Sequence, residues 1–187
     1  MSRFVLAALL ALYRWKGWKL GGAKPPVRKC VIVGAPHTSN WDFVFFLGAT
    51  HAYGIRPRFM GKHSLFRWPM RRFMEDMGGV AVNRSKAGNY VDAMVSEFAA
   101  HDDFHLVIAP EGTRSSIGAW RSGFYHIAVR AKVPIVCAWV DNERMEGGMG
   151  MMIQPTGNYA ADMARIAAYY ATMMPSHPRL AHMLDHD

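Results

Sequence analysis

Short apolar segments that read as β-strands alternate with longer segments that read as helices, from residue 29 to residue 173. The strand candidates are rich in β-branched or apolar residues. This alternation predicts an α/β fold, a layered domain whose largely parallel or mixed central sheet is flanked by helices. The order of the strands does not follow from it. The expected strands are residues 29–34, 56–61, 79–83, 105–109, 134–140 and 149–154, and the expected helices are 41–53, 69–77, 87–100, 123–132 and 158–173.

The N-terminus contains an apolar helical segment, Phe4 to Tyr13, with basic residues on both sides. A helix of ten residues is about 15 Å long, half of the ~30 Å hydrocarbon core of a bilayer, so it cannot span a membrane. Trp15 and Trp18 alternate with basic residues behind it, which favours an anchor that lies in the membrane interface. A helix docked on the domain and a signal peptide are the alternatives, and "YRWKGWKL" offers no small-residue cleavage site.

A chain of 187 residues suits one domain with a sizeable core. The sequence contains no internal repeat and no linker long enough to separate two domains. The stretch "GGAKPPVRK", residues 21–29, divides the N-terminal helix from the body. We therefore expect a membrane-interface helix and linker over residues 1–24 and a single domain over residues 25–187.

Cysteine and histidine usage gives no indication of a metal site. Cys30 and Cys137 both lie inside apolar runs, which favours buried, reduced thiols in a cytosolic protein. No zinc-type spacing is present, and the histidines other than His37 form no tight set of ligands. No metal is therefore expected.

The net charge of +8 is concentrated in one half of the chain. Residues 1–86 carry 15 Lys/Arg against 3 Asp/Glu, and residues 87–187 carry 7 against 11. A basic half indicates an anionic partner: a nucleic acid, a phosphorylated substrate or an anionic membrane. A merely solvated basic face is the alternative, and charge alone does not decide between them.

Polar residues follow three of the expected strands. His37 and Asp42 follow the first strand, Glu111 and Arg114 follow the fourth, and Arg84 follows the third. Sites gather at the carboxyl ends of strands in α/β sheets, so these groups would converge if the strands are parallel neighbours.

Each of these groups also has a purely structural explanation. Ser39 and Asp42 have the spacing of a helix capping box. Glu111 and Arg114 could form an exposed ion pair worth under about 1 kcal/mol. Arg84 could be a solvated loop arginine.

Taken together, the motifs resemble those of the glycerolipid acyltransferases, the family of the 1-acyl-glycerol-3-phosphate acyltransferases. The resemblance covers roughly residues 30–140, and its most specific parts are His-x4-Asp and Pro-Glu-Gly-Thr-Arg-Ser. The family often has Glu where Ser64 stands, Lys where Arg121 stands, and a longer N-terminal membrane segment. The matching stretches are His37 with Asp42, "GKHSLFRWP" (61–69), "GGVAVNR" (78–84), "PEGTRS" (110–115), "WRSGFYHIA" (120–128) and "VPIV" (133–136).

The resemblance assigns a general base to His37 and an orienting carboxylate to Asp42. A neutral imidazole can remove the proton of an attacking hydroxyl near pH 7, and a carboxylate can hold it in one tautomer. Five residues along one regular helix lie about 140° apart, at roughly 100° per residue, so the two cannot share a helical face. We expect His37 in the turn and Asp42 bending back from the first turn of the helix.

The resemblance also implies that the acceptor hydroxyl attacks an acyl thioester directly, without a protein nucleophile or a cofactor. The acceptor phosphate would be bound by Arg84 and Arg114, with Gly112 allowing close backbone approach. Thr113 would donate its hydroxyl, and Glu111 would orient an arginine or bind a glycerol hydroxyl. Lys62 is a weaker candidate for the anionic surface or the acyl carrier.

We therefore predict a peripheral acyltransferase on the cytoplasmic face of the cell membrane, with residues 25–187 as the acyltransferase domain. The donor would be acyl-CoA or acyl-carrier protein, and the acceptor a lysophospholipid such as 1-acyl-glycerol-3-phosphate. The same chemistry on glycerol 3-phosphate or a lyso-aminolipid is the first alternative. A non-catalytic basic protein that binds membranes or nucleic acid is the second, although we expect no nucleic-acid partner.

Overall fold

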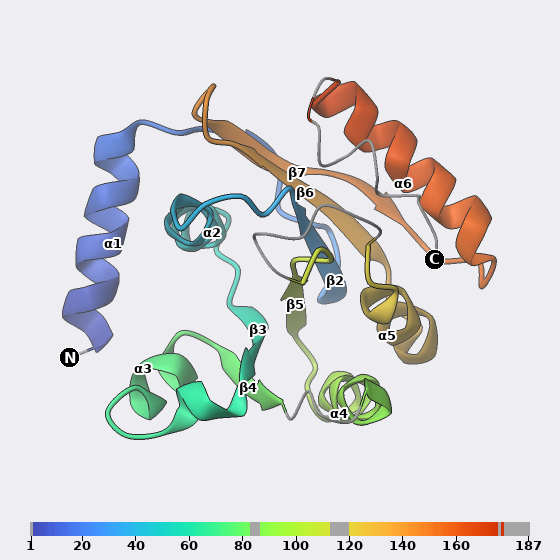
Figure 1. Cartoon of the computed structure of the whole chain (residues 1–187), viewed down its shortest axis with the longest axis horizontal. Helices are drawn as coiled ribbons and strands as arrows, with labels where there is room; N and C mark the ends of the chain where they lie inside the picture. Colours follow the sequence, from blue (N-terminus) through green and yellow to red (C-terminus); the bar gives the residue numbers. More distant parts are fainter. Residues whose placement is uncertain (1, 83–86, 113–119, 176, 178–187) are drawn as a thin grey trace.

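A seven-stranded mixed sheet forms the centre of the molecule, and helices cover both of its faces (Figure 1). The computed structural model describes residues 2–82, 87–112, 120–175 and 177. The elements in chain order are α1 (Ser2–Lys16), β1 (Lys19–Gly22), β2 (Lys29–Ala35), α2 (Trp41–Ala52), β3 (Pro57–Lys62), the 3₁₀-helix η1 (His63–Phe66), α3 (Arg71–Asp76), β4 (Gly79–Val82), α4 (Ala87–Ala100), β5 (Phe104–Ile108), α5 (Gly123–Ala131), β6 (Ile135–Asp141), β7 (Glu146–Ile153) and α6 (Tyr159–Met173).

The strand order is β1-β7-β6-β2-β5-β3-β4. Strands β6, β2, β5, β3 and β4 are parallel to one another, whereas β7 runs antiparallel to β6. The edge strand β1 pairs with β7 and is parallel to it. The predicted α/β class and mixed central sheet are therefore confirmed. The expected strands and helices are all present, with ends that differ by at most three residues.

The central strand β2 is buried on both faces, which explains its unbroken apolar sequence "CVIV". Val31 and Val33 belong to the main core, which α4, α5 and α6 cover. Cys30 and Ile32 point to the opposite face, where α2 lies. Both cysteines are buried and unpaired, and burial raises the pKa of the Cys30 and Cys137 thiols to about 12. They are core residues, as the sequence predicts.

Tyr170 of α6 joins the neighbouring strands β2 and β6. Its buried hydroxyl oxygen lies 2.8 Å from the carbonyl oxygen of Val33 and 2.9 Å from that of Ala138. Burial raises the pKa of Tyr170 well above its usual value, so the hydroxyl keeps its proton and can donate it to either carbonyl. This contact holds together the two strands that lead to His37 and Asn142.

The N-terminal helix α1 packs on the outer side of α2 (Figure 1). Leu10 and Trp18 are buried there, and Trp18 stacks on Tyr13 at a centroid distance of 5.7 Å. The expectation that Trp18 lies in a membrane interface is therefore wrong, because aromatic rings from α1 and α2 enclose it. Phe4 and Trp15 remain 84% and 76% exposed.

Residues expected to be a linker contribute a strand. Gly21 and Gly22 belong to β1, which pairs with β7. Sequence reasoning missed β1 because its glycines read as a breaker. Gly22 is needed for the close approach of the two strands, since its φ is +80° and a Cβ there would overlap the carbonyl oxygen of Met149 in β7. Among the described residues, no helix is both long enough and apolar enough to cross a membrane.

The contact between α1 and α2 depends on Gly48, because a Cβ there would lie 2.1 Å from Cγ of Tyr13. We predict that Gly48→Ala lowers the free energy of unfolding by about 1 kcal/mol. Overpacking costs roughly 1–3 kcal/mol and outweighs the gain of about 1 kcal/mol in helix propensity. Gly34→Ala is the control, because no neighbouring atom lies within 4 Å of its added methyl group. A Gly48→Ala protein as stable as the wild type in urea unfolding would contradict this packing.

Candidate active site

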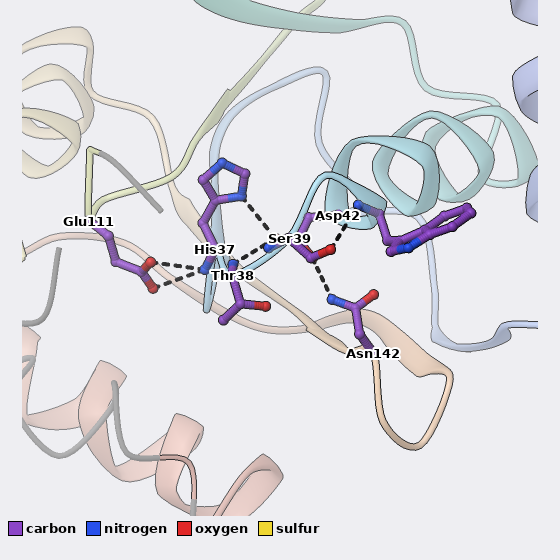
Figure 2. A network of polar contacts seen from close by, with 7 residues as sticks. His37, Thr38, Ser39, Asp42, Glu111 and Asn142 are labelled. Carbon is purple, nitrogen blue, oxygen red and sulfur yellow. Dashed lines mark hydrogen bonds and ion pairs between the residues drawn. The ribbon is translucent and has the colours of Figure 1, made fainter. Parts of the chain in front are cut away.

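The neighbouring strands β6, β2 and β5 end side by side, and each leads into a polar residue of one hydrogen-bonded network (Figure 2). β2 leads into His37, β5 into Glu111 and β6 into Asn142. The predicted convergence of the His37 and Glu111 segments is confirmed. The strand before Arg84, β4, lies at the edge of the sheet, with β5 and β3 between it and β2.

His37 and Asp42 are in direct contact. Nδ1 of His37 lies 3.0 Å from Oδ2 of Asp42. His37 sits in the turn after β2, and Asp42 lies in the first turn of α2 and bends back toward it, as the spacing predicts. The side chain of Asp42 is 8% exposed and that of His37 is 32% exposed. A buried carboxylate therefore holds a partly accessible imidazole.

The same carboxylate organises the start of the helix. Oδ2 of Asp42 accepts hydrogen bonds from the backbone N–H groups of Thr38, at 2.7 Å, and Ser39, at 2.8 Å. The hydroxyl oxygen of Ser39 accepts from the N–H of Trp41 rather than from that of Asp42. Half of a capping box is present, in which the acid reaches back to Ser39. The side chain of Asp42 thus both caps the start of α2 and orients the ring of His37.

Burial by itself would raise the pKa of Asp42, but hydrogen bonds from His37, Ser39, Asn142 and Thr38 outweigh it and hold the pKa below its usual value of 3.8. Asp42 is therefore ionised at neutral pH. Because its folded pKa is depressed, it contributes stability that is present above pH 3.8 and is lost as the pH falls through the lower folded value.

Glu111 holds the backbone of His37. Both of its carboxylate oxygens accept the N–H of His37, at 3.0 and 2.9 Å. Glu111 is only 4% exposed, so its interpretation as a member of an exposed ion pair is wrong. Two buried carboxylates therefore fix His37: Glu111 through its backbone and Asp42 through its ring.

Gly112 and Arg121 lie together beside this network. Gly112 has a φ of +75°, which glycine adopts without strain. A Cβ at that position would lie 2.8 Å from Nε of Arg121, so the missing side chain makes room for the guanidinium group. Sequence reasoning noted Arg121 only as a departure from the family pattern. The motif "WRSGFYHIA" was the signal that could have placed it at the site.

Of the remaining predicted site residues, the structure describes Lys62 alone. Lys62 is exposed at the end of β3 and does not line the cavity described below. Arg84, Thr113 and Arg114 lie outside the residues that the structure describes.

Asn142 is a site residue that sequence reasoning missed. It lies in the turn between β6 and β7, and its side-chain Nδ2 donates to Oδ1 of Asp42. Its position directly after an expected strand, residues 134–140, was the available signal. The stretch "DNERM" carries no motif, so only the sheet order brings it to Asp42.

A cavity of about 590 Å³ opens at His37 and Asp42 and continues between α2 and the sheet. Its polar end includes His37, Asp42 and Arg121. Its body is apolar and is lined by side chains from both layers, among them Ile32, Phe46, Ala49, Phe59, Val107 and Met149. An imidazole beside an apolar cavity suits chemistry at the polar end of a molecule with a hydrocarbon tail.

The described residues contain no cluster of three or more His, Cys, Asp or Glu side chains placed to hold a metal ion. The arrangement can instead do acid–base chemistry through one imidazole oriented by one carboxylate.

Comparisons with known proteins agree with this geometry. A family model described as Acyltransferase matches residues 22–141. The fold is similar to the crystal structure of the 1-acyl-sn-glycerophosphate (LPA) acyltransferase PlsC from Thermotoga maritima, with a TM-score of 0.61 and 16% sequence identity. The match covers 94% of this chain and 82% of the PlsC chain. A search of curated proteins finds no significant match.

At 16% identity the likeness to PlsC shows a common fold. The family model is the stronger result, because it spans more than half of the chain and includes His37, Asp42 and Glu111. The chain therefore belongs to the acyltransferase family.

Proposed function

We propose that this protein transfers a fatty acyl group from an acyl thioester to a free hydroxyl of a lysophospholipid such as 1-acyl-glycerol-3-phosphate. The observation that carries the proposal is the His37–Asp42 pair at the polar end of an apolar cavity. The donor would be acyl-CoA or acyl-carrier protein, and no further cofactor takes part.

The reaction follows from the protonation state of the pair. With Nδ1–H of His37 donating to Asp42, the neutral ring offers Nε2 as a base. Nε2 takes the proton of the acceptor hydroxyl while its oxygen attacks the thioester carbonyl carbon. The tetrahedral intermediate collapses, the C–S bond breaks, and the thiolate leaves with the proton that His37 returns. Asp42 stabilises the imidazolium that forms between these steps.

The apolar part of the cavity suits a fatty acyl chain. Each methylene group that leaves water for such a surface gains about 0.8 kcal/mol. The carbonyl end would lie near His37, and the hydrocarbon tail would run between α2 and the sheet. This arrangement favours a long-chain donor over an acetyl donor.

The acceptor phosphate needs cations near His37. Among the described residues, Arg121 is the cation that lines the cavity. Arg84 and Arg114 remain candidates from the motif resemblance, together with Thr113. Lys62, away from the cavity, is better placed for a membrane surface or an acyl carrier.

Two alternatives share parts of this account. Glycerol 3-phosphate or a lyso-aminolipid would undergo the same chemistry. A non-catalytic basic protein that binds membranes or nucleic acid would need only the positive charge of residues 1–86, and not the His37–Asp42 pair. Release of free thiol from an acyl thioester, dependent on an acceptor lipid, separates the enzyme from the binding protein.

We predict that His37→Ala lowers the turnover number by roughly 10²–10⁴-fold, because it removes the general base. Asp42→Asn should also be severely impaired, since an amide no longer selects the tautomer of His37. His51→Ala is the matched control, because His51 is an exposed histidine at the other end of α2. Thiol release with product analysis by mass spectrometry measures the effect. Near-normal turnover of a folded His37→Ala protein would end the proposed mechanism.

We predict that Arg121→Ala raises the Michaelis constant for a phosphorylated acceptor roughly tenfold, as expected for losing a charge-assisted contact of about 1.5 kcal/mol. Arg121→Lys should recover part of this loss, because it keeps the charge without the bidentate geometry. Arg130→Ala is the control, since Arg130 pairs with Asp92 on the surface. If the Michaelis constant for the acyl donor rises by the same factor, Arg121 does not bind the acceptor phosphate specifically.

We also propose that α1 and the η1–α3 segment place the protein on the cytoplasmic face of the cell membrane. The two regions lie on the same side of the molecule and contact each other (Figure 1). Phe4 and Trp15 are exposed on α1, and Leu65, Trp68 and Met70 are exposed around η1 and α3. Exposed cations accompany them: Arg14, Lys62, Arg71 and Arg72. Apolar side chains beside basic ones suit an anionic lipid surface.

We predict that combining Phe4→Ala, Trp15→Ala and Trp68→Ala weakens binding to anionic liposomes and lowers activity on vesicle-embedded acceptor. These side chains are exposed, so the fold should survive, whereas deleting residues 1–20 would also remove the packing of Leu10 and Trp18. Met152→Ala, which removes an exposed side chain of β7, is the control. Activity on a short-chain, water-soluble acceptor should be spared. Equal sedimentation of all forms with liposomes at every salt concentration would refute the membrane proposal.

A further inference from the structure

The two carboxylate oxygens of Asp42 have different partners. Oδ2 lies against the His37 ring and the N–H groups of Thr38 and Ser39, all within the same turn. Oδ1 receives its hydrogen bond from Nδ2 of Asn142, which lies 100 residues away in the chain. The donors to Oδ2 all belong to the turn itself, whereas the hydrogen bond from Asn142 links the Asp42 carboxylate directly to the segment that follows β6.

The hairpin that carries Asn142 is itself held firmly. Oδ1 of Asp141 accepts the N–H groups of Glu143 and Arg144, each at 2.9 Å, which closes the turn. The N–H of Lys19 in β1 donates to the carbonyl of Met145 at 2.8 Å. The side chain of Asn142 is therefore presented from a fixed backbone.

The orientation of the Asn142 amide leaves one of its atoms without a partner. Its Oδ1 is buried, and among the described residues no donor reaches it. Turning the amide over would place this oxygen against the carboxylate of Asp42, where two acceptors would repel each other. A buried orphan acceptor is unfavourable and uncommon in folded proteins. The hydrogen bond from Nδ2 to Asp42 thus fixes the orientation of the amide, although Oδ1 of Asn142 then lacks a donor among the described residues.

Asn142 and Glu111 act on the pair from opposite sides (Figure 2). Glu111, after β5, holds the backbone of His37, and Asn142, after β6, holds the carboxylate of Asp42. Because β5 and β6 flank β2, each neighbouring strand supplies one side chain that restrains the loop between β2 and α2.

We propose that Asn142 is a positioning residue of the acyl transfer reaction: its amide holds the Asp42 carboxylate turned so that Oδ2 faces His37. This inference rests on the proposed function of the His37–Asp42 pair. Asn142 acts through Asp42 and touches neither donor nor acceptor.

Two measurements on Asn142→Ala test the proposal. The first is a ¹³C NMR titration of the Asp42 carboxyl group, which does not depend on catalysis. Asp42 should take up its proton at a higher pH than in the wild type, because a donor to its ionised form is gone. The second is steady-state acyl transfer, in which the turnover number should fall about tenfold or more while the Michaelis constants change little.

Asn142→Asp is the second variant, because it places another carboxylate against Asp42. Like charges should raise the pH at which Asp42 is protonated beyond that of Asn142→Ala, and lower the turnover number further. Arg144→Ala is the control for the hairpin itself, since its exposed side chain lies two residues further along the same turn. It should leave both measurements unchanged.

The outcomes separate this proposal from the proposed function. If Asp42 titrates as in the wild type in both Asn142 variants, the positioning role is refuted. If Asn142→Ala loses activity only as much as Arg144→Ala does, it is refuted as well. If the titration shifts as expected but the wild-type protein transfers no acyl group, Asn142 does act on Asp42, and the acyl transfer function is wrong.

Discussion

The hydrogen bonds that converge on the Asp42 carboxylate determine how the site is built. One buried acid caps the start of α2, fixes the turn after β2 and receives the ring of His37. An ionised carboxylate excluded from water is unfavourable unless its lone pairs are satisfied. Four donors from the turn and from the β6–β7 hairpin meet this requirement. Orientation of the His37 ring and stability of the loop therefore depend on the same interaction.

Helix α2 links this network to the rest of the molecule. Its first turn carries Asp42, one side of it covers the apolar cavity, and its outer side receives α1 through Gly48. The cavity lies between α2 and the face of the sheet, so a hydrocarbon chain there would end beside His37. The N-terminal segment supports the same assembly from outside, because β1 holds the hairpin of Asn142. It has a structural role whether or not its exposed side chains bind a membrane.

Local patterns were enough to predict most elements, and the contact between His37 and Asp42 was predicted from the family resemblance together with their spacing. The strands are apolar and the helices long, so periodicity separates them, and the spacing of His37 and Asp42 fits a turn followed by a helix start. Asn142 and the buried position of Trp18 were missed for one reason: each depends on which strands or helices become neighbours. Strand β1 was missed because its two glycines are typical of a turn or linker. Glu111 was assigned to the site, but its bond to the backbone of His37 carries no sequence signal. The order β6-β2-β5 creates these contacts, and it cannot be read from the chain.

The central claim is that Asp42 fixes His37 with its proton on Nδ1, so that Nε2 can act as the base. Long-range ¹H–¹⁵N NMR correlation of the histidine rings, with His37 assigned through a His37→Gln variant, measures this directly. At a pH where the ring is neutral, we expect protonated Nδ1 and unprotonated Nε2 in the wild type, with the preference lost in Asp42→Asn. A neutral His37 protonated at Nε2, or a tautomer unaffected by Asp42→Asn, would contradict the account.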